Sequence, residues 1–339
     1  MRRGFEASLR CLGCRGNEWA LEATRDDERE VREGTLRCQR CARSYVIEKG
    51  ILTTLDPQDE SLAREVKGWH ELAGPLGEGL VSTMTALPYY PHVPWPHLAP
   101  DFFQVFEYVD FHDKNVVDLG AGRTWASRHI AALGWAREVV AVDVLTRRFL
   151  GLETADVFYA EDRKHFERIC GDVHQIPLVD GWADVVFSAA AIHHSGERER
   201  LFAETWRLLK PGGTFVFVGE PSKKASIPDR QPQNEETAVG INEHIYSFQE
   251  YMGALKEQGF RPRHLAPRSI RYRMAYPDPE FMEGLFPPLR RLSRSALGRR
   301  LITRLVRGRF TGPLIYRYAN LPLTVIALKP GAASARRLG

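Results

Sequence analysis

Long hydrophobic segments are absent from this 339-residue sequence. The longest apolar run, near Ala189–Ile192, has about eight residues, far short of the ~20 that a membrane-spanning helix needs. The opening residues, MRRGFEASLRCLGC, contain no apolar h-region, so we expect no signal peptide and a cytoplasmic location. With 43% hydrophobic and 27% charged residues, the chain is expected to be globular with a substantial core.

Acidic residues are absent from one segment near the C-terminus. Residues 285–310 hold eight arginines and no Asp or Glu, although the whole chain has a net charge of only +4. A partial helical stripe is formed by Leu289, Leu292, Ala296, Leu301 and Leu305. The arginines fit an anionic membrane surface, RNA or an anionic lipid-linked substrate, and the structural alternative is a solvated helix paired with acidic residues of the connector. Stacked aromatic residues typical of single-strand RNA platforms are lacking in this segment.

Cysteine is scarce, and four of the five cysteines form two CxxC pairs. Cys11 and Cys14 make the first pair, Cys38 and Cys41 make the second, and Cys170 stands alone. Each CxxC can bend into a knuckle that presents two thiolates, and two knuckles complete a tetrahedral zinc site. Four thiolates leave no open coordination position, so we predict a structural zinc ion. Disulfides or a redox dithiol are the alternative, but redox CxxC motifs usually occur singly at a helix N-terminus.

The stretch after the second knuckle, SYVIEKGIL at 44–52, predicts a strand, a glycine turn and another short apolar strand. Together with the knuckles it resembles the Trm112-like zinc-ribbon family over residues 5–56, with Val46 where the family has proline. The resemblance implies a small partner or accessory module for methyltransferases. A ribbon of roughly 50 residues has too little core to fold well without its metal.

Residues 57–112 are expected to connect this ribbon to the rest of the chain. A helix is predicted over Ser61–Ala73. The stretch LPYYPHVPWPH at 87–97 has four prolines among aromatic residues, which excludes a regular helix. It fits either a packed interdomain linker or an ordered aromatic lid over a pocket.

From Lys114 onward, short apolar strands alternate with helices, which predicts a doubly wound, Rossmann-like α/β sheet. The expected strands are 115–119, 138–144, 183–189, 214–219 and a returning strand at 321–328, and the expected helices are 125–133 and 197–209. In such a fold, ligands bind at the carboxyl ends of the strands.

The first loop of this sheet, DLGAGRTW at 118–125, lacks the third glycine of a dinucleotide-binding GxGxxG. Trp125 stands in its place and disfavours NAD or FAD, because their pyrophosphate requires tight packing at the helix N-terminus. S-adenosylmethionine (SAM) has no phosphate, and Gly120 and Gly122 suffice for the backbone to approach it. Asp118 can accept hydrogen bonds from its ammonium group, and Asp143 at the next strand end can bind both ribose hydroxyls.

Further motifs follow in the order found in one enzyme family. GDVHQIP at 171–177, DGWADVVF at 180–187, IHH at 192–194 and WRLLKPGG at 206–213 accompany VVDLGAG and VVAVDV. As a set they resemble class I SAM-dependent methyltransferases of the type 11 group over residues 114–220. The resemblance implies that Asp118, Gly120 and Gly122 surround the methionyl end of SAM. It also implies that Asp143 binds the ribose and that Asp172 and Val173 contact the adenine. Thr124 takes the place of the family's glycine, which costs little unless its backbone needs a positive φ.

Candidate catalytic residues follow two of the expected strands. His193 and His194 come after the strand at 183–189, and Glu220 comes after the strand at 214–219. Each can act as a base for an amine or hydroxyl acceptor, or serve only as a cap or packing residue. The candidates for acceptor binding precede an amphipathic helix and are Asn242, Glu243, His244 and Tyr246. The alternative is that they only cap the N-terminus of that helix and form a solvated turn. The polar loop at 222–237 is a candidate lid.

The predicted organisation is a zinc ribbon at 1–56, a connector at 57–112, a SAM-binding core at 113–221, a lid with the basic insertion and final strand at 222–330, and a tail at 331–339. We expect an enzyme that methylates a small-molecule, sugar or lipid-linked acceptor by in-line transfer, peripheral at the inner membrane surface if the basic segment binds lipid. An RNA methyltransferase that binds RNA through the ribbon and the basic segment is the alternative, although no NPPY-type motif for exocyclic base nitrogens occurs. A non-catalytic SAM-binding or partner protein is the third hypothesis, and the oligomeric state stays open.

Overall fold

A computed structural model describes residues 1–56, 58–74, 87–89, 98–161, 165–228, 233–276 and 279–331. Its strands are β1 Trp19–Asp26, β2 Val31–Cys38, β3 Ser44–Glu48, β4 Ile51–Thr53, β5 Asn115–Leu119, β6 Glu138–Asp143, β7 Glu167–Cys170, β8 Ala183–Ala189, β9 Leu209–Glu220, β10 Arg261–Leu265 and β11 Leu323–Leu328. They form one sheet in the order β1-β2-β3-β4-β7-β6-β5-β8-β9-β11-β10. Most of the proline-aromatic stretch, part of the candidate lid and nearly all of the tail lie outside the described residues.

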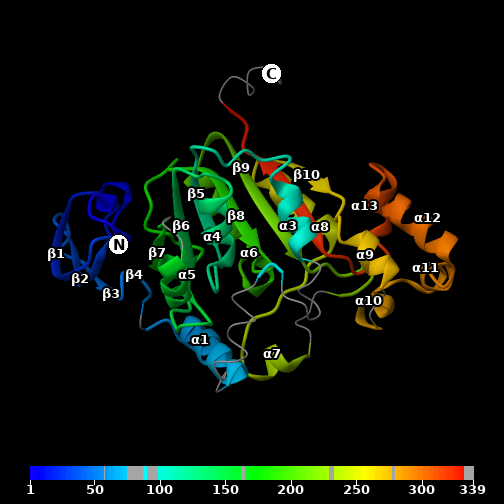
Figure 1. Cartoon of the computed structure of the whole chain (residues 1–339), viewed down its shortest axis with the longest axis horizontal. Coiled ribbons are helices and arrows are strands. Elements are labelled where there is room, and N and C mark those ends of the chain that lie inside the picture. Colours follow the sequence, from blue (N-terminus) through cyan, green and yellow to red (C-terminus); the bar gives the residue numbers. More distant parts are fainter. Residues whose placement is uncertain are drawn as a thin grey trace.

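Helices cover both faces of this sheet (Figure 1). They are α1 Glu60–Ala73, α3 Leu98–Val105, α4 Trp125–Ala132, α5 Ala155–Glu161, α6 Arg198–Leu208, α7 Glu235–Ala238, α8 Phe248–Glu257, α9 Ile270–Ala275, α10 Pro279–Gly284, α11 Pro287–Leu292, α12 Ala296–Arg307 and α13 Thr311–Ile315, with 3₁₀ turns η1 Phe5–Ser8, η3 Leu152–Thr154 and η4 Ile192–His194. Within the described part of the chain, no helix is long and apolar enough to cross a membrane.

The centre of the sheet, from β7 to β9, is parallel and agrees with the doubly wound α/β fold that the sequence predicts. Neighbouring residues of a strand pack into opposite cores, so that Val116 lies with α3, α4 and α5 whereas Val117 lies with α6 and α8. A strand buried on both faces is apolar at most of its positions, which explains the nearly continuous apolar runs in the sequence. β10 and β11 then complete one edge in antiparallel register.

The N-terminal ribbon belongs to the same sheet. Strand β4 pairs in parallel with β7, with Leu52 opposite Ile169 and Thr53 opposite Cys170. Strand β7 is absent from the sequence-based prediction, because its residues Glu167 and Arg168 read as polar and yet are buried. Pairing with the ribbon covers an edge of the parallel sheet that would otherwise expose its backbone groups.

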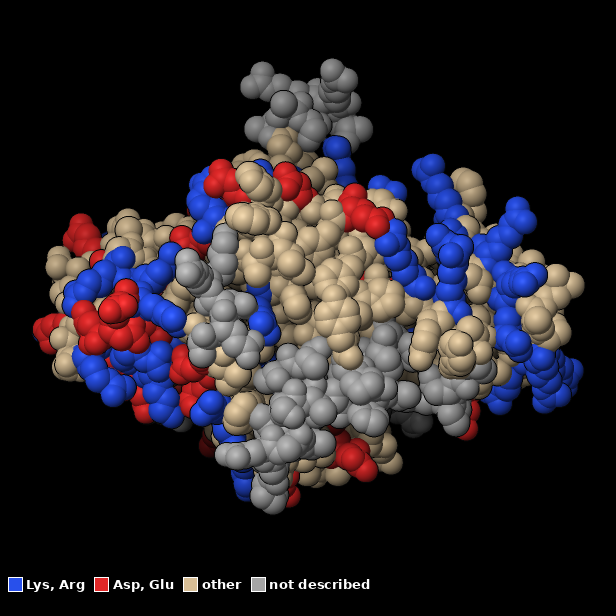
Figure 2. Space-filling model, viewed as in Figure 1, with Lys and Arg blue, Asp and Glu red and all other residues tan. Residues whose placement is uncertain are grey.

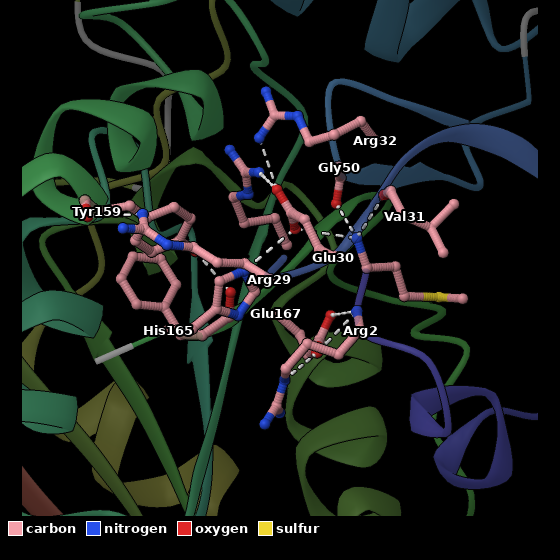
Figure 3. Close-up of polar contacts among 12 residues, drawn as sticks. Arg2, Arg29, Glu30, Val31, Arg32, Gly50, Tyr159, His165 and Glu167 are labelled. Carbon is pink, nitrogen blue, oxygen red and sulfur yellow. Dashed lines mark hydrogen bonds and ion pairs between the residues drawn. The ribbon is translucent and has the colours of Figure 1, made fainter. Parts of the chain in front are cut away.

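A buried cluster of charges lies where the ribbon meets the parallel sheet (Figure 3). Glu30, which precedes β2, accepts hydrogen bonds from Arg168 and Arg32 at 2.6 Å and from the Met1 ammonium group at 3.0 Å. His165 Nε2 lies 3.1 Å from the same carboxylate. The side chains of Glu30 and Arg168 are 2% and 0% exposed. Burial opposes ionisation of Glu30, but the hydrogen bond from His165 and the charges of Arg168 and the ammonium group lower its pKa to about 2.

Candidate active site

The glycine loop between β5 and α4 contains three residues with positive φ. Gly120 and Gly122 have φ values of 64° and 47°, and a Cβ on Gly120 would lie 2.4 Å from the side chain of Ala191. Thr124 also has a positive φ, of 59°. Thr124 therefore holds the left-handed backbone conformation that glycine adopts freely. That conformation costs an ordinary residue about 1–2 kcal/mol, so replacement of the family's glycine is costly here.

Two aspartates follow the next strands and line the same cavity as this loop. Asp143, at the end of β6, accepts hydrogen bonds from the backbone N–H of Gly122 at 2.7 Å and of Leu145 at 2.8 Å. Burial raises the pKa of Asp143. Asp172, beyond β7, accepts a hydrogen bond from the ring Nδ1 of His174 at 2.6 Å. Burial alone would raise the pKa of Asp172, but the hydrogen bond and charge of His174 outweigh it and lower that pKa.

Asp118 lies deeper, beneath the loop. It is 1% exposed, accepts a hydrogen bond from Ser127 Oγ at 2.6 Å, and is absent from the cavity lining. Burial raises its pKa to about 7. Asp118 therefore supports the glycine loop through α4, and the lining residues among the predicted cofactor ligands are Gly120, Gly122, Asp143, Asp172 and Val173.

The cavity has a volume of about 560 Å³ and continues past the loop to the ends of β8 and α1. Of the three predicted catalytic residues, only His194 lines it. The Nδ1–H of His194 donates to the carbonyl oxygen of Asn242 at 2.8 Å, which leaves Nε2 as the unprotonated nitrogen of a neutral ring. Burial, aided by neighbouring His193, lowers the pKa of His194 to about 3.

His193 and Glu220 form a buried pair behind that wall. Glu220 is 0% exposed and accepts hydrogen bonds from the backbone N–H groups of Ala191 and Ile192 at 2.7 and 2.9 Å. It also accepts a hydrogen bond from His193 Nδ1 at 2.9 Å. Burial opposes the charge on His193, but Glu220 outweighs it and raises the pKa of His193. The pair thus holds the 3₁₀ turn that carries His194 in place.

Of the predicted acceptor-binding residues, Asn242 lines the cavity and the other three do not. Glu243 is buried and accepts a hydrogen bond from Asn234. The backbone N–H of His244 donates to the carbonyl oxygen of His193 at 2.6 Å. Tyr246 is buried beneath the guanidinium group of Arg198, 4.1 Å from its ring centre. These contacts fix the loop that presents Asn242.

The sequence-based prediction missed Glu65 and Trp69 of α1, which line the cavity together with His194. Glu65 accepts hydrogen bonds from Trp69 Nε1 at 3.2 Å and from the backbone and side-chain amides of Asn242 at 3.0 and 2.8 Å. Burial raises the pKa of Glu65. The Trp69 ring meets His194 edge to face at 5.2 Å. In the sequence this segment looks like an ordinary amphipathic helix, so no signal marks Glu65 and Trp69 as cavity-lining residues.

The four paired cysteines converge in the ribbon. One Sγ atom from each of Cys11, Cys14, Cys38 and Cys41 lies within 4.8 Å of all the others. A tetrahedral zinc site with Zn–S bonds of about 2.3 Å requires S···S separations of about 3.8 Å, so this cluster fits such an ion. Two residues of the same region, Leu12 and Arg43, also line the cavity.

Comparison with known proteins agrees with this geometry. Residues 117–217 match the family described as a methyltransferase domain. A dimethylglycine N-methyltransferase from Parasynechococcus marenigrum is 41% identical over 113 residues, which is 30% of this chain and 36% of that protein. An arsenite methyltransferase from Halobacterium salinarum is 25% identical over 159 residues, 46% of this chain and 39% of that protein. The chain thus spans little more than a third of the length of these relatives.

Among solved structures, Haemonchus contortus phosphoethanolamine N-methyltransferase 2 with S-adenosyl-L-methionine aligns with 88% of this chain and 63% of its own, at 16% identity and a TM-score of 0.48. At that score the likeness does not bear on substrate or partner. The matched family, the strand order and the glycine loop followed by Asp143 and Asp172 agree with one another. Residues 117–217 of this chain are therefore a methyltransferase domain, built on the Rossmann-like α/β sheet that the sequence predicts.

Proposed function

We propose that the chain transfers the methyl group of SAM to a small-molecule acceptor, and that both molecules occupy the cavity described above. The observation that carries this proposal is the shared lining of that cavity. The glycine loop, Asp143 and Asp172 line one part, and Glu65, Trp69 and His194 line the other. Its volume of about 560 Å³ lies in the ordinary range for small-ligand sites.

The residues present fit SAM at one end of this cavity. Gly120 and Gly122 would let the backbone approach the methionyl end, Asp143 would bind the ribose hydroxyls, and Asp172 would accept a hydrogen bond from the adenine amino group. Bound SAM supplies an electrophilic methyl group on a sulfonium. The task of this chain is then to align a nucleophile with that methyl group and to exclude water.

His194 is the residue that we propose to orient the nucleophile. Its unprotonated Nε2 can accept a hydrogen bond from an amine or hydroxyl group of the acceptor. A pKa of about 3 keeps the ring neutral at physiological pH, so that it does not repel a sulfonium. Glu65 offers carboxylate oxygens on the same side, which favours acceptors with N–H or O–H groups.

We also propose that the cysteine cluster holds zinc in a structural role. Four thiolates would saturate a tetrahedral ion, so that no water or substrate could bind the metal. The role of the zinc would be to hold the knuckles that present Leu12 and Arg43 to the cavity wall.

The alternative hypothesis of an RNA acceptor has less support. The arginines of residues 285–310 are absent from the cavity lining, so the basic segment does not lead directly to the proposed methyl donor. The proposal also includes sugar and lipid-linked acceptors whose methylated group is small enough to enter the cavity.

Label transfer tests the proposal. The purified chain is incubated with methyl-labelled SAM and a lysate of its source organism, after which RNA, protein, lipid and small-molecule fractions are separated. We expect label in the small-molecule or lipid fraction. Label in RNA would contradict the proposal, and SAM binding without any transfer would favour the non-catalytic hypothesis.

Matched histidine variants connect that activity to the site. His194→Ala is expected to reduce transfer by about a hundredfold or more, the lower end of the range for a group that handles the reacting proton. His112→Ala removes an exposed histidine outside the cavity and should leave transfer unchanged. Equal activity in the two variants would remove His194 from the proposed mechanism.

A further inference from the structure

Helix α12 has two different faces. Its N-terminus is capped by Ser295, whose Oγ accepts a hydrogen bond from the backbone N–H of Gly298 at 2.9 Å. Gly298, Ile302 and Val306 recur every four residues and are buried against the rest of the protein. The opposite face leaves Leu297, Arg300, Leu301 and Arg304 exposed, at the helical spacing that places them side by side. Leucine and arginine thus alternate along a surface that faces solvent.

The exposed apolar side chains near α12 are unusual within this molecule. Phe310 and Leu297, which are 85% and 78% exposed, are the most exposed large hydrophobic residues in the described part of the chain. Leu314 of α13 is 52% exposed and Leu301 is 45% exposed. Apolar residues gathered in this way on a folded domain mark an interaction site more often than isolated exposed residues do.

The charge of this region has one sign. Glu283 is the last acidic residue of the sequence. Arg291, Arg294, Arg300, Arg304 and Arg307 are exposed, and none of the five forms an ion pair with any residue that the structure describes. The structural alternative, in which acidic residues of the connector neutralise these arginines, therefore has no support among the described residues.

Figure 2 shows basic side chains crowding the end of the molecule where α11, α12 and α13 lie. We call the exposed set the basic surface, and it consists of Arg291, Arg294, Leu297, Arg300, Leu301, Arg304, Arg307, Phe310 and Leu314. None of these residues lines the cavity. The ribbon lies at the opposite end of the sheet (Figure 1), so the basic surface is separate from both the zinc site and the cofactor loop.

We propose that the basic surface docks the protein onto an anionic lipid bilayer. Arginines near a negatively charged membrane are attracted to its anionic headgroups. Leucine and phenylalanine side chains on the same surface gain free energy by entering the boundary between headgroups and acyl chains, as in other interfacial amphipathic helices. RNA would use the arginines, but exposed leucines offer nothing to phosphates or to base faces. The combination of both side-chain types therefore favours lipid.

Vesicle co-sedimentation of the full chain tests this inference and needs neither SAM nor an acceptor. The expected result is binding to vesicles of phosphatidylcholine mixed with phosphatidylglycerol, little binding to phosphatidylcholine alone, and weaker binding as sodium chloride increases. Arg300→Glu/Arg304→Glu and Leu297→Ser/Leu301→Ser should each lower the partition coefficient by about tenfold or more. These side chains are exposed, and circular dichroism melting would verify that the variants fold.

Two control variants match these changes elsewhere on the surface. Arg37→Glu/Arg261→Glu alters the net charge by the same amount, and Val46→Ser/Leu133→Ser removes two apolar side chains that are each 55% exposed. Both should bind vesicles as the parent chain does. Equal losses in test and control variants would overturn the proposal, as would equal binding to neutral and anionic vesicles. Salt-sensitive binding to an RNA oligonucleotide that needs Arg300 and Arg304 but not the leucines, without vesicle binding, would assign the surface to nucleic acid instead.

Discussion

The junction of the ribbon with β7 and the exposed face of α12 both contain several arginines, but they use them differently. At the junction, Arg168 is 0% exposed and pairs with Glu30 and Asp156. On α12, Arg300 and Arg304 are exposed and unpaired among the described residues. A buried guanidinium needs carboxylate partners because desolvation is costly, whereas an exposed one keeps its hydration and can meet an external partner. The number of arginines in a segment therefore does not reveal their role.

The largest effect is expected from losing the metal that we propose for the ribbon. Cys38→Ser removes one of the four thiolates, and structural zinc contributes on the order of 10 kcal/mol to the folding of zinc-finger peptides. We expect the variant to lose zinc in elemental analysis and the ribbon to become protease-sensitive. Cys170→Ser changes a cysteine outside the cluster and should retain one zinc ion per chain. A parent protein that is stable and free of metal would rule out the zinc assignment.

The next effect concerns the buried cluster of charges. Glu30→Gln leaves Arg168 without its closest carboxylate, and removing one partner of a buried ion pair costs about 3–5 kcal/mol. Denaturant unfolding measures this loss. Glu33→Gln is the matched control, because its partner Arg25 is 62% exposed and such surface pairs contribute less than about 1 kcal/mol. Similar losses in both variants would mean that the junction is not held by this cluster.

The same variant has a pH signature. The folded protein lowers the pKa of Glu30 to about 2 from the ordinary 4.5, so its stabilising contribution is complete above pH 4.5 and disappears as the pH falls toward 2. A shift of this size corresponds to a contribution on the order of 3 kcal/mol. The difference in unfolding free energy between the parent and Glu30→Gln should therefore narrow over that interval. Protonation of the cysteine thiolates affects both proteins and cancels in the difference.

Strands β5, β6, β8 and β9 could be predicted because each contains a largely apolar run. Strand β7 could not, since burial of its charged residues Glu167 and Arg168 depends on partners from other segments, among them Arg2 and Glu30 of the ribbon. The same contacts unite the ribbon and the parallel strands in one sheet. The pattern of a single sequence can predict individual helices and strands. The pairing of β4 with β7 joins residues more than a hundred positions apart, and such a pattern does not reveal it.

The candidate site also has one part that the sequence could predict and one part that it could not. Gly120, Gly122, Asp143 and Asp172 follow successive strands, so the fold itself brings them to one edge. The proposed acceptor side depends on Glu65 and Asn242, which meet across a sequence separation of 177 residues. The cost of threonine at position 124 could not be predicted, because it depends on a positive φ that the sequence alone does not reveal.

A smaller effect is expected at the centre of the sheet, between these two regions. Asp143→Ala removes a carboxylate that we propose to bind the ribose hydroxyls, and that also holds the N–H of Gly122. SAM affinity measured by calorimetry should fall at least about tenfold, or 1.4 kcal/mol. Asp110→Ala removes an exposed aspartate outside the cavity and should bind SAM normally. Unchanged affinity in Asp143→Ala would remove this residue from the cofactor site.

The smallest expected effect sharpens the comparison between the junction and α12. Arg300→Ala/Arg304→Ala removes two exposed, unpaired guanidinium groups, so the free energy of unfolding should change by less than about 0.5 kcal/mol. The same variant should bind anionic vesicles more weakly, since about 1 kcal/mol of attraction is lost with each arginine. Denaturant melts and vesicle binding on one preparation separate the two effects. A loss of stability as large as that of Glu30→Gln would show that the α12 arginines hold the fold, and that the junction and α12 use arginine in the same way.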